Sequence, residues 1–306
     1  MKKTNRVYGV IGIGSYMSMW NADMNGGPKS TVNDEIFGSD KALKYSIKNL
    51  WKCQGKKVLY IKHRDANYDL LNLAQIYEEL FKEKLPKEKD KDKNKKVLNN
   101  IFKCIDVRNF GCTFAVDKIN IGVTGVVQIG QGMNKWNDSN RISIDILSPF
   151  VNPKKEEGTM TSIGTKNVVD EVHYFYPLTI NPFNVEDLIG VIDGYEGYTE
   201  EDYETLKKSL LICATALDTN SKVGCENEFA LFVNCKNNSE IFLSNLDSYI
   251  SMDENRIVNI NDLLNYLKPY MEDIDSIEIF YNDKKLSIDY EKNDKLIVKN
   301  MYGEIL

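Results

Sequence analysis

Apolar and polar side chains alternate over residues 6–19, and this two-residue period predicts a half-buried β-strand. Odd-numbered and even-numbered positions point to opposite sides of that strand. Its glycines predict a flat face that another backbone can approach closely. Gly12 and Gly14 do not begin a dinucleotide-binding loop, because Met17 stands where the third glycine should be and no helical pattern opens there.

Helical and strand patterns continue along the chain. A helix is predicted after the N-cap Ser39, with Asp40 in its first turn, and another after Thr199, with Asp202 three residues later. The predicted elements are strands at 56–62, 111–116, 119–130 and 227–235 and helices at 69–81, 199–217 and 260–271. This β-α-β order with insertions predicts an α+β fold with a ferredoxin-like sheet.

One segment is almost devoid of apolar residues. Residues 82–96 contain eight lysines, four acidic residues and one proline. Such a segment cannot bury a core, so it is predicted to be a mobile insertion or a solvated turn. Contact with nucleic acid is the alternative interpretation of its lysines.

The charge of the chain is unevenly distributed. The 306 residues suffice for one large domain or two modest ones, and the net charge of −6 argues weakly against a simple nucleic-acid binder. Residues 1–64, however, contain twelve basic and four acidic residues, whereas residues 246–306 contain seven basic and thirteen acidic ones. This asymmetry predicts a basic working surface, unless folding mixes the two segments.

Composition also bears on location. No run of eighteen apolar residues is present, and the basic N-terminus lacks the apolar stretch of a signal peptide. Six cysteines are scattered without a C-x-x-C pair, which favours reduced thiols and shows no zinc-binding pattern. We therefore expect a cytoplasmic protein without a membrane span.

Candidates for catalytic chemistry are few. His173 has alternating neighbours and is predicted to be a strand residue, whereas His63 either contacts a phosphate or ends a strand. No metalloprotease, P-loop or EF-hand motif is present. Asp23 is the one carboxylate to consider for metal-assisted RNA cleavage, although a loop Asp more commonly bonds its own backbone. We expect no enzyme activity, no cofactor and no metal site.

Eight segments follow one another in an order that is more specific than any one of them. They are the opening strand with NADMNGGPKS, then FGSDKALKYSIKNLW, DVRNFGCTFA, GVVQIGQGMN, SIGTKNVVDE, INPFNVEDL, TEEDYETLKKSLL and LDTNSKVGCENEFALFV. Over residues 5–235 this set resembles the repeated backbone subunit of type I CRISPR Cascade complexes, of the RAMP superfamily, and we expect the type I-B branch. Ala22 and Met24 depart from the family pattern in the first loop. Val223 stands where the family has an arginine that contacts phosphate.

The resemblance implies a single RAMP-type domain over residues 1–306 that folds like a hand. An RRM-like palm would be accompanied by an inserted finger region and a β-hairpin thumb at residues 153–175. Residues 246–306 would form an acidic α/β extension, about which the resemblance says little. The palm segments would be residues 5–64, 104–150 and 176–235.

The resemblance also implies a function. Copies of the chain would assemble head-to-tail along CRISPR RNA (crRNA), bind its phosphate backbone and present the guide for pairing with target DNA in antiviral defence. The implied partners are crRNA, the target DNA strand through the guide, further copies of the chain and other Cascade subunits. The alternative is a RAMP-type endoribonuclease, which either processes guides or cuts target RNA as type III subunits do. The failed glycine pattern disfavours a nucleotide-dependent oxidoreductase.

Candidate RNA-binding residues come from the helical pattern and from the resemblance. Lys41, Lys44 and Lys48 lie opposite the apolar stripe of the first predicted helix and are predicted to contact guide phosphates. The glycine-rich first strand would let RNA or a neighbouring subunit lie close. The other candidates are Asn21, Asn25, Gly26, Gly27 and Lys29 in the first loop, Arg108, Gln131, Met133 and Asn134 in the middle of the chain, Met160, Ile163 and Lys166 in the thumb, and Ser221 and Lys222.

Several of these candidates have specific predicted roles. Met160 and Ile163 would wedge against a base while Lys166 meets a phosphate. Arg108 would either face the RNA groove or pin a palm loop. Phe110 beside it is predicted to be a core residue, because strand aromatics usually pack.

Overall fold

The computed structural model describes residues 1–151 and 160–306, with the side chains of residues 1–147 and 164–306. Its α-helices are α1 Asp40–Cys53, α2 Leu73–Phe81, α3 Lys93–Ile101, α4 Ile105–Phe110, α5 Glu200–Leu210 and α6 Asn261–Leu267. Its strands are β1 Val7–Ser18, β2 Phe37–Gly38, β3 Gly111–Val116, β4 Ile119–Thr124, β5 Val127–Ile129, β6 Gly132–Asn134, β7 Arg141–Val151, β8 Met160–Ile180, β9 Cys225–Cys235, β10 Ser251–Met252, β11 Ile257–Asn259, β12 Ile274–Tyr281, β13 Ser287–Asp289 and β14 Leu296–Asn300. Within the described residues, no helix has the length and apolar character needed to cross a membrane.

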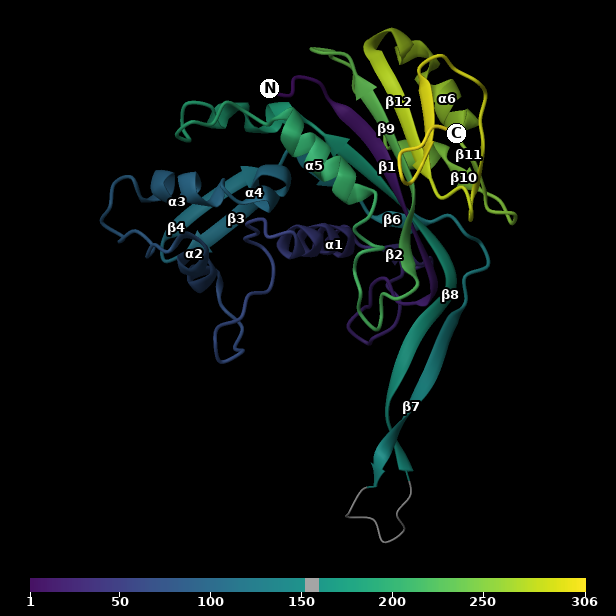
Figure 1. Cartoon of the computed structure of the whole chain (residues 1–306), viewed down its shortest axis with the longest axis horizontal. Helices are drawn as coiled ribbons and strands as arrows, with labels where there is room; N and C mark the ends of the chain where they lie inside the picture. Colours follow the sequence, from purple (N-terminus) through teal and green to yellow (C-terminus); the bar gives the residue numbers. More distant parts are fainter. Residues whose placement is uncertain (152–159) are drawn as a thin grey trace.

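The fold is built around one central sheet. Over the described residues it has nine strands in the order β14-β12-β9-β1-β8-β6-β2, and β5 and β7 also pair with β8. The pairs β1–β8, β1–β9 and β12–β9 are antiparallel and β12–β14 is parallel, so the sheet is mixed. Helices α1 and α5 lie on one side, the C-terminal elements lie on the other, and the β7–β8 hairpin projects away (Figure 1). This confirms a mixed helix and strand class.

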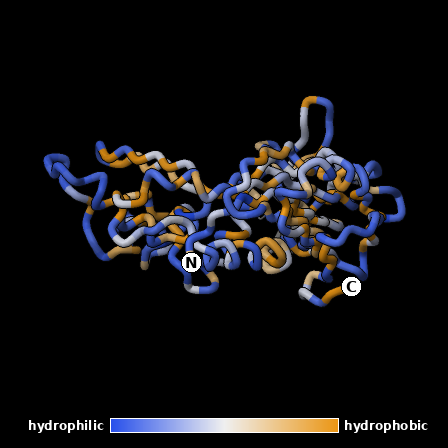
Figure 2. The backbone as a smooth tube through the Cα atoms, turned by 90° about the horizontal axis from the view of Figure 1, so that it is seen from above, coloured by the Kyte–Doolittle hydropathy of each residue, from blue (hydrophilic) through white to orange (hydrophobic). Residues whose placement is uncertain are grey.

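Strand β1 lies between β8 and β9 and is buried on both faces. Ile11 and Ile13 join the hydrophobic core beneath α1 and α5, whereas Tyr8 and Val10 join a second core beneath the C-terminal extension, residues 246–306. The predicted strand is therefore confirmed, but its predicted half-burial is wrong. Figure 2 shows most hydrophobic segments inside the molecule and hydrophilic segments in the outer loops.

The glycines of β1 make room for side chains of this same chain. A Cβ atom added to Gly12 would lie 2.7 Å from Cβ of Phe229, and one added to Gly14 would lie 2.4 Å from Oε2 of Glu228. Phe229 and Glu228 thus fill the face that was expected to admit RNA or a neighbouring subunit. That expectation is wrong for these two glycines, because side chains of the neighbouring strand β9 occupy the space beside them.

Side-chain hydrogen bonds mark where α1 and α5 begin and where α5 ends. Helix α1 begins after Ser39, whose Oγ accepts the N–H of Ala42 at 3.3 Å. Helix α5 begins after the predicted capping box of Thr199. It ends at Leu210 rather than at residue 217, because Nδ2 of Asn227 donates to the Leu210 carbonyl at 2.7 Å. Asn227 Oδ1 also accepts the N–H of Ala214 at 2.8 Å.

The strand predicted at residues 56–62 is not formed. The N–H groups of Leu59 and Tyr60 donate instead to the carboxylate of Asp106, at 2.9 and 2.8 Å. Asp106 is buried in α4, which also contains Phe110, so this aromatic ring packs on Trp51 from a helix rather than from a strand. A buried carboxylate needs such partners, and it takes the backbone donors that a sheet would have used.

Two further boundaries differ from the sequence pattern. Helix α2 begins at Leu73 rather than at residue 69, because Asn72 and Gln75 form a capping box. The lysine-rich segment ends in helix α3, which starts at Lys93, and its residues 82–92 are mainly solvent-exposed. The solvated turn predicted for this segment therefore describes its first part only.

The β7–β8 hairpin is longer than the polar segment at residues 153–175. Its pairing runs from Arg141 opposite Val169 to Val151 opposite Met160. The second strand then continues into the central sheet, where it pairs with β1 as far as Ile180. Residues 152–159 lie outside the described part of the chain.

The C-terminal extension packs as a layer on the central sheet. Helix α6 ends at Leu267, and a 3-10 helix containing Pro269 follows, so the helix predicted at residues 260–271 is shorter than its pattern. Leu263, Leu264 and Leu267 contribute to the second core. The extension is thus integrated with the sheet through buried apolar contacts.

We predict that Gly12→Ala destabilises the protein by about 1–3 kcal/mol, the usual cost of overpacking a core. The added methyl group would meet Cβ of Phe229, which cannot turn away as the end of a flexible side chain can. Chemical denaturation of the purified chain measures the loss. The matched control is Gly122→Ala in β4, where an added Cβ meets nothing within 4 Å. Equal stability of the two variants would contradict the close packing of β1.

Candidate nucleic-acid interface

The loop at residues 19–38 is fastened at both ends. Nε1 of the buried Trp20 donates to the Tyr176 hydroxyl at 2.5 Å. Oδ1 of Asn21 accepts the N–H of Ser39 at 2.5 Å, and its Nδ2 donates to the Phe37 carbonyl at 3.0 Å. These bonds tie the loop to β8 and to the N-terminus of α1. Asn21 is therefore a buried residue that holds the two ends of the loop together, and it is not exposed for contact with RNA.

The tip of this loop is exposed and organised by Asp23. Oδ1 of Asp23 accepts the N–H groups of Asn25 and Gly27 at 2.8 and 2.9 Å. Gly26 has a φ of 82°, a conformation that favours glycine. Asn25 and Gly26 are exposed, and Lys29 is half-buried on the returning strand of the loop. Asp23 thus has the common role of a loop Asp that bonds its own backbone.

Two other segments meet this loop. Nδ2 of Asn167, in β8, donates to the Gly26 carbonyl at 2.9 Å. The backbone carbonyl of Ser221 accepts the N–H of Met19 at 2.9 Å. Nζ of Lys222 donates to the carbonyls of Met19, at 2.7 Å, and Trp20. The first loop, the loop before β9 and the root of the hairpin therefore form one continuous surface.

The two lysines at this junction already have intramolecular partners. Lys166 donates to Oδ1 of Asn220 at 3.0 Å, which links the hairpin to the loop before β9. Burial lowers the pKa of Lys222, whose ammonium lies on two carbonyls of the first loop. Lys222 thus holds the loops together, whereas Lys166 is half-buried and near the surface.

Lys41, Lys44 and Lys48 of α1 line a cavity of about 370 Å³ between that helix and the β3–β4 hairpin. Lys41 and Lys44 pair with Asp40 at 2.6 and 3.4 Å, and Gln131 bonds the same Asp40 through its side-chain amide. Lys48 is half-buried and has no hydrogen-bond or ion-pair partner among the described residues. Burial lowers the pKa of both Lys44 and Lys48. The charge of Lys48 faces that of the buried Asp106, which lines the same cavity.

Three of the predicted site residues bond other parts of this same chain. Arg108 pairs with Asp202 at 2.9 Å and donates to two backbone carbonyls, which fixes α4 to α5. The side chain of Asn134 bonds the backbone of Trp136 and the N–H of His173. Met133 pairs with β2 and β8 in the sheet. The pinning alternative for Arg108 matches this geometry. Met133 and Asn134 lie beside the first loop, because Met133 pairs with Phe37 and the N–H of Asn134 donates to the Ile36 carbonyl at 3.3 Å.

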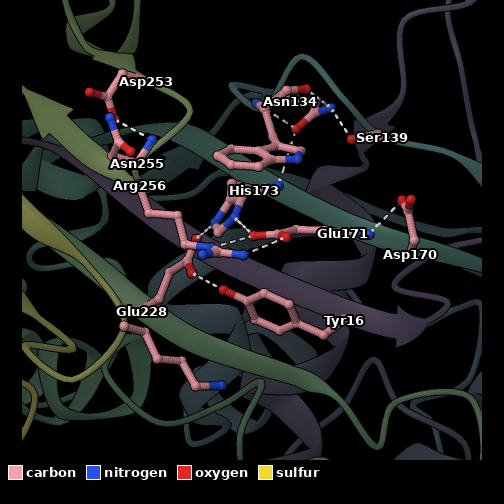
Figure 3. Close-up of polar contacts among 12 residues, drawn as sticks. Tyr16, Asn134, Ser139, Asp170, Glu171, His173, Glu228, Asp253, Asn255 and Arg256 are labelled. Carbon is pink, nitrogen blue, oxygen red and sulfur yellow. Dashed lines mark hydrogen bonds and ion pairs between the residues drawn. The ribbon is translucent and has the colours of Figure 1, made fainter.

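The side chains of Met160 and Ile163 lie outside the described residues, although both backbone positions belong to β8. Their wedge role stays a prediction. Sequence reasoning also missed a polar cluster around His173, which comes from segments far apart in the chain (Figure 3). His173 is a strand residue as predicted, but its carboxylate partners Glu171 and Glu228 carried no recognisable motif.

Comparisons with known proteins agree with this architecture. The sequence matches the family model described as CRISPR-associated protein Cas7 over residues 5–275. A chain of a solved structure described as "CRISPR RNA-guided surveillance complex, pre-nicking" is similar at a TM-score of 0.50 and 12% identity, with 95% of this chain and 97% of that chain covered.

A second solved chain, from a "CRISPR RNA-guided surveillance complex", has a TM-score of 0.47 and 12% identity, with 95% of each chain covered. A search of curated proteins finds no significant match. The identity to the first solved chain is low, so that likeness concerns the fold. The family match covers most of the sequence, and the chain therefore belongs to the family of CRISPR-associated protein Cas7.

Proposed function

We propose that this protein is a repeated backbone subunit of a type I Cascade complex, of the I-B branch, which binds crRNA along its phosphate backbone. The central sheet with α1 and α5 would serve as an RRM-like palm, and the β7–β8 hairpin as the thumb. The observation that carries this proposal is the junction of the first loop, the loop before β9 and the hairpin root in a member of the Cas7 family.

The junction offers the groups that a phosphate backbone needs. The side-chain amide of Asn25 is exposed at the tip of the first loop, and Lys29 lies on the same loop. Contacts of this kind position a nucleic acid without reading its sequence. Lys48 and the cavity beside α1 would bind a further phosphate, because three ammonium groups line this cavity and a half-buried ammonium is stabilised by an anion.

The partners follow from this function. Copies of the chain would associate along one crRNA and leave its bases free to pair with a target DNA strand. Other Cascade subunits would bind the ends of that assembly. We propose a binding role without catalysis, because Asp23, the candidate for cleavage, is committed to the backbone of its own loop.

We predict that RNA of discrete length co-purifies with the protein when it is expressed with a CRISPR array and its partner subunits. Each bound copy would protect an equal stretch of RNA, so partial nuclease digestion should give fragments that differ by a constant increment. Denaturing gels of the extracted RNA provide the measurement. Absence of RNA, or fragments of random length, would contradict the backbone function.

We predict that Lys48→Gln weakens crRNA binding and lowers the dependence of log Kd on log salt by roughly 0.7, the value for one phosphate on a single strand. Titration of labelled RNA at several salt concentrations measures both quantities. Lys52→Gln is the matched control, because it removes the same charge from the same helix outside the cavity and Lys52 bonds the Lys62 carbonyl. Identical salt dependence in the two variants would exclude Lys48 as a phosphate contact.

We predict that Asp23→Asn leaves crRNA binding unchanged, because the amide oxygen of Asn can accept the same two backbone N–H groups. Asp23→Ala removes that acceptor and should loosen the loop and weaken binding. Labelled RNA complementary to the guide, incubated with magnesium, tests for cleavage in parallel. Magnesium-dependent cutting by the native protein that Asp23→Asn abolishes would favour the endoribonuclease instead.

A further inference from the structure

His173 lies between two carboxylates in the interior of the protein (Figure 3). Its side chain is 0% exposed, Nδ1 is 2.6 Å from Oε1 of Glu228, and Nε2 is 2.9 Å from Oε1 of Glu171. A neutral imidazole carries one N–H group, so it can donate to one of these oxygens and would turn a lone pair towards the other. With both carboxylates ionised, both contacts are hydrogen bonds only when the ring is protonated. The geometry fits an imidazolium between two carboxylates.

The C-terminal extension contributes a second positive charge to the cluster, on Arg256. Arg256 binds Glu171 with two parallel hydrogen bonds, from Nε at 2.6 Å and from Nη2 at 2.8 Å. Its guanidinium also lies 5.4 Å from the ring of Trp136, which itself packs on His173 at 5.5 Å. Arg256 and Trp136 thus close the cluster on the side of the extension.

The turn that carries Arg256 is held in a specific conformation. Oδ1 of Asp253 accepts the N–H groups of Asn255 and Ile257, at 2.9 and 2.8 Å. Arg256 has a φ of 59°, in the left-handed region that is strained for a non-glycine residue. The contacts with Glu171 offset this strain, so the turn and the cluster depend on each other.

The cluster also lies at the root of the β7–β8 hairpin. Asp170 precedes Glu171 in β8. The carboxylate of Asp170 accepts two hydrogen bonds from Asn140, one from the backbone N–H at 2.7 Å and one from the side-chain amide at 2.8 Å. Asn140 is the last residue before β7. The same short segment therefore connects the hairpin root to the extension.

The charges around His173 balance only when it is protonated. His173, Arg256 and Lys285 would carry positive charge, and Glu171, Glu226 and Glu228 negative charge. Loss of the imidazolium proton would leave an excess negative charge next to Glu228, whose side chain is 0% exposed. The charged and titratable groups that face the cluster are Glu171 from β8, Glu226 and Glu228 from β9, Tyr16 from β1, Arg256 from the turn after β10, Lys285 from the turn after β12, and the neighbouring pair of Lys135 and Asp247.

We propose that protonated His173 is the central cation of a pH-dependent latch, which fixes the C-terminal extension and the hairpin root to the central sheet. Loss of its proton releases both, because one imidazole nitrogen then opposes a carboxylate and Glu228 loses its compensating charge. The latch belongs to the protein alone and operates in the absence of nucleic acid.

The direction of the pH dependence follows from the environment of the ring. Burial opposes protonation of His173, but the hydrogen bonds and charges of Glu228 and Glu171 outweigh it and raise the pKa of the imidazole. A raised pKa in the folded state contributes stability below about pH 6.5, the ordinary histidine value, and this contribution is lost as pH rises through the folded pKa. Burial also raises the pKa of Asp247, so that group must be separated from His173 by mutation.

Two measurements on the full chain test the latch. The sequence contains two histidines, so the Cε1–H resonance of His173 can be assigned by comparison with a His63→Gln variant. Hydrogen exchange of peptides from residues 246–306 and 139–142, corrected for the intrinsic pH dependence of amide exchange, reports release. We expect the His173 resonance to titrate above about pH 6.5, with exchange rising across the same midpoint. The rise should be about tenfold for every pH unit by which the folded pKa of His173 exceeds its ordinary value.

Variants separate the latch from general loss of stability. His173→Gln should abolish the pH step in exchange, whereas Asp247→Asn should retain it. Arg256→Gln, at a side chain 42% exposed, should raise exchange of the extension and hairpin root already at about pH 6, below the ordinary histidine pKa. The matched control is Lys268→Gln, which removes an exposed partner of Glu291 from the same extension and should change nothing.

Several outcomes would overturn the latch. One is a His173 resonance that does not titrate above about pH 6.5, the ordinary histidine value. Another is a pH step in exchange that persists in His173→Gln. If His173→Gln fails to fold, the comparison of Arg256→Gln with Lys268→Gln tests the latch instead. Equal hydrogen exchange in these two variants would exclude the latch.

Discussion

The rest of the structure depends on the close packing of β1 between β8 and β9. This strand pairs along both edges and buries both faces, which requires that its neighbours on the extension side approach the backbone directly. Gly12 and Gly14 permit this, because Phe229 and Glu228 occupy the space where their side chains would be. Helices can then cover one side of the sheet while the extension covers the other.

The same arrangement separates opposite charges. The lysines of α1 lie on the helix side of the sheet, whereas the acidic extension packs on the opposite side. A chain of net negative charge can therefore present a basic cavity beside α1. The first loop contacts both the hairpin root and the loop before β9, through hydrogen bonds of Asn167 and Lys222 to its carbonyls.

Buried charged side chains join the central sheet to the extension, and the two also pack together through apolar contacts. Isolated ions are costly inside a protein, so each must have partners of opposite charge. The cluster of His173, Glu171, Glu228 and Arg256 meets this requirement with groups from β8, β9 and the extension. These elements must pair in one register, because a slip by one residue would direct the charged side chains to the opposite face.

The sequence by itself determined the local elements: the alternation of β1, the caps at Ser39 and Thr199, and the ordered motifs of the family. These follow from contacts within a few residues. Tertiary structure decided the rest. Residues 56–62 do not form a strand, because Asp106 accepts the backbone N–H groups there. A bulge opposite Gly12 and Ile13 leaves Glu228 without a partner residue on β1, so the alternation of β9 could not indicate which way its side chain points. Long-range partners set these features, and a local pattern carries no information about groups that are distant in the chain.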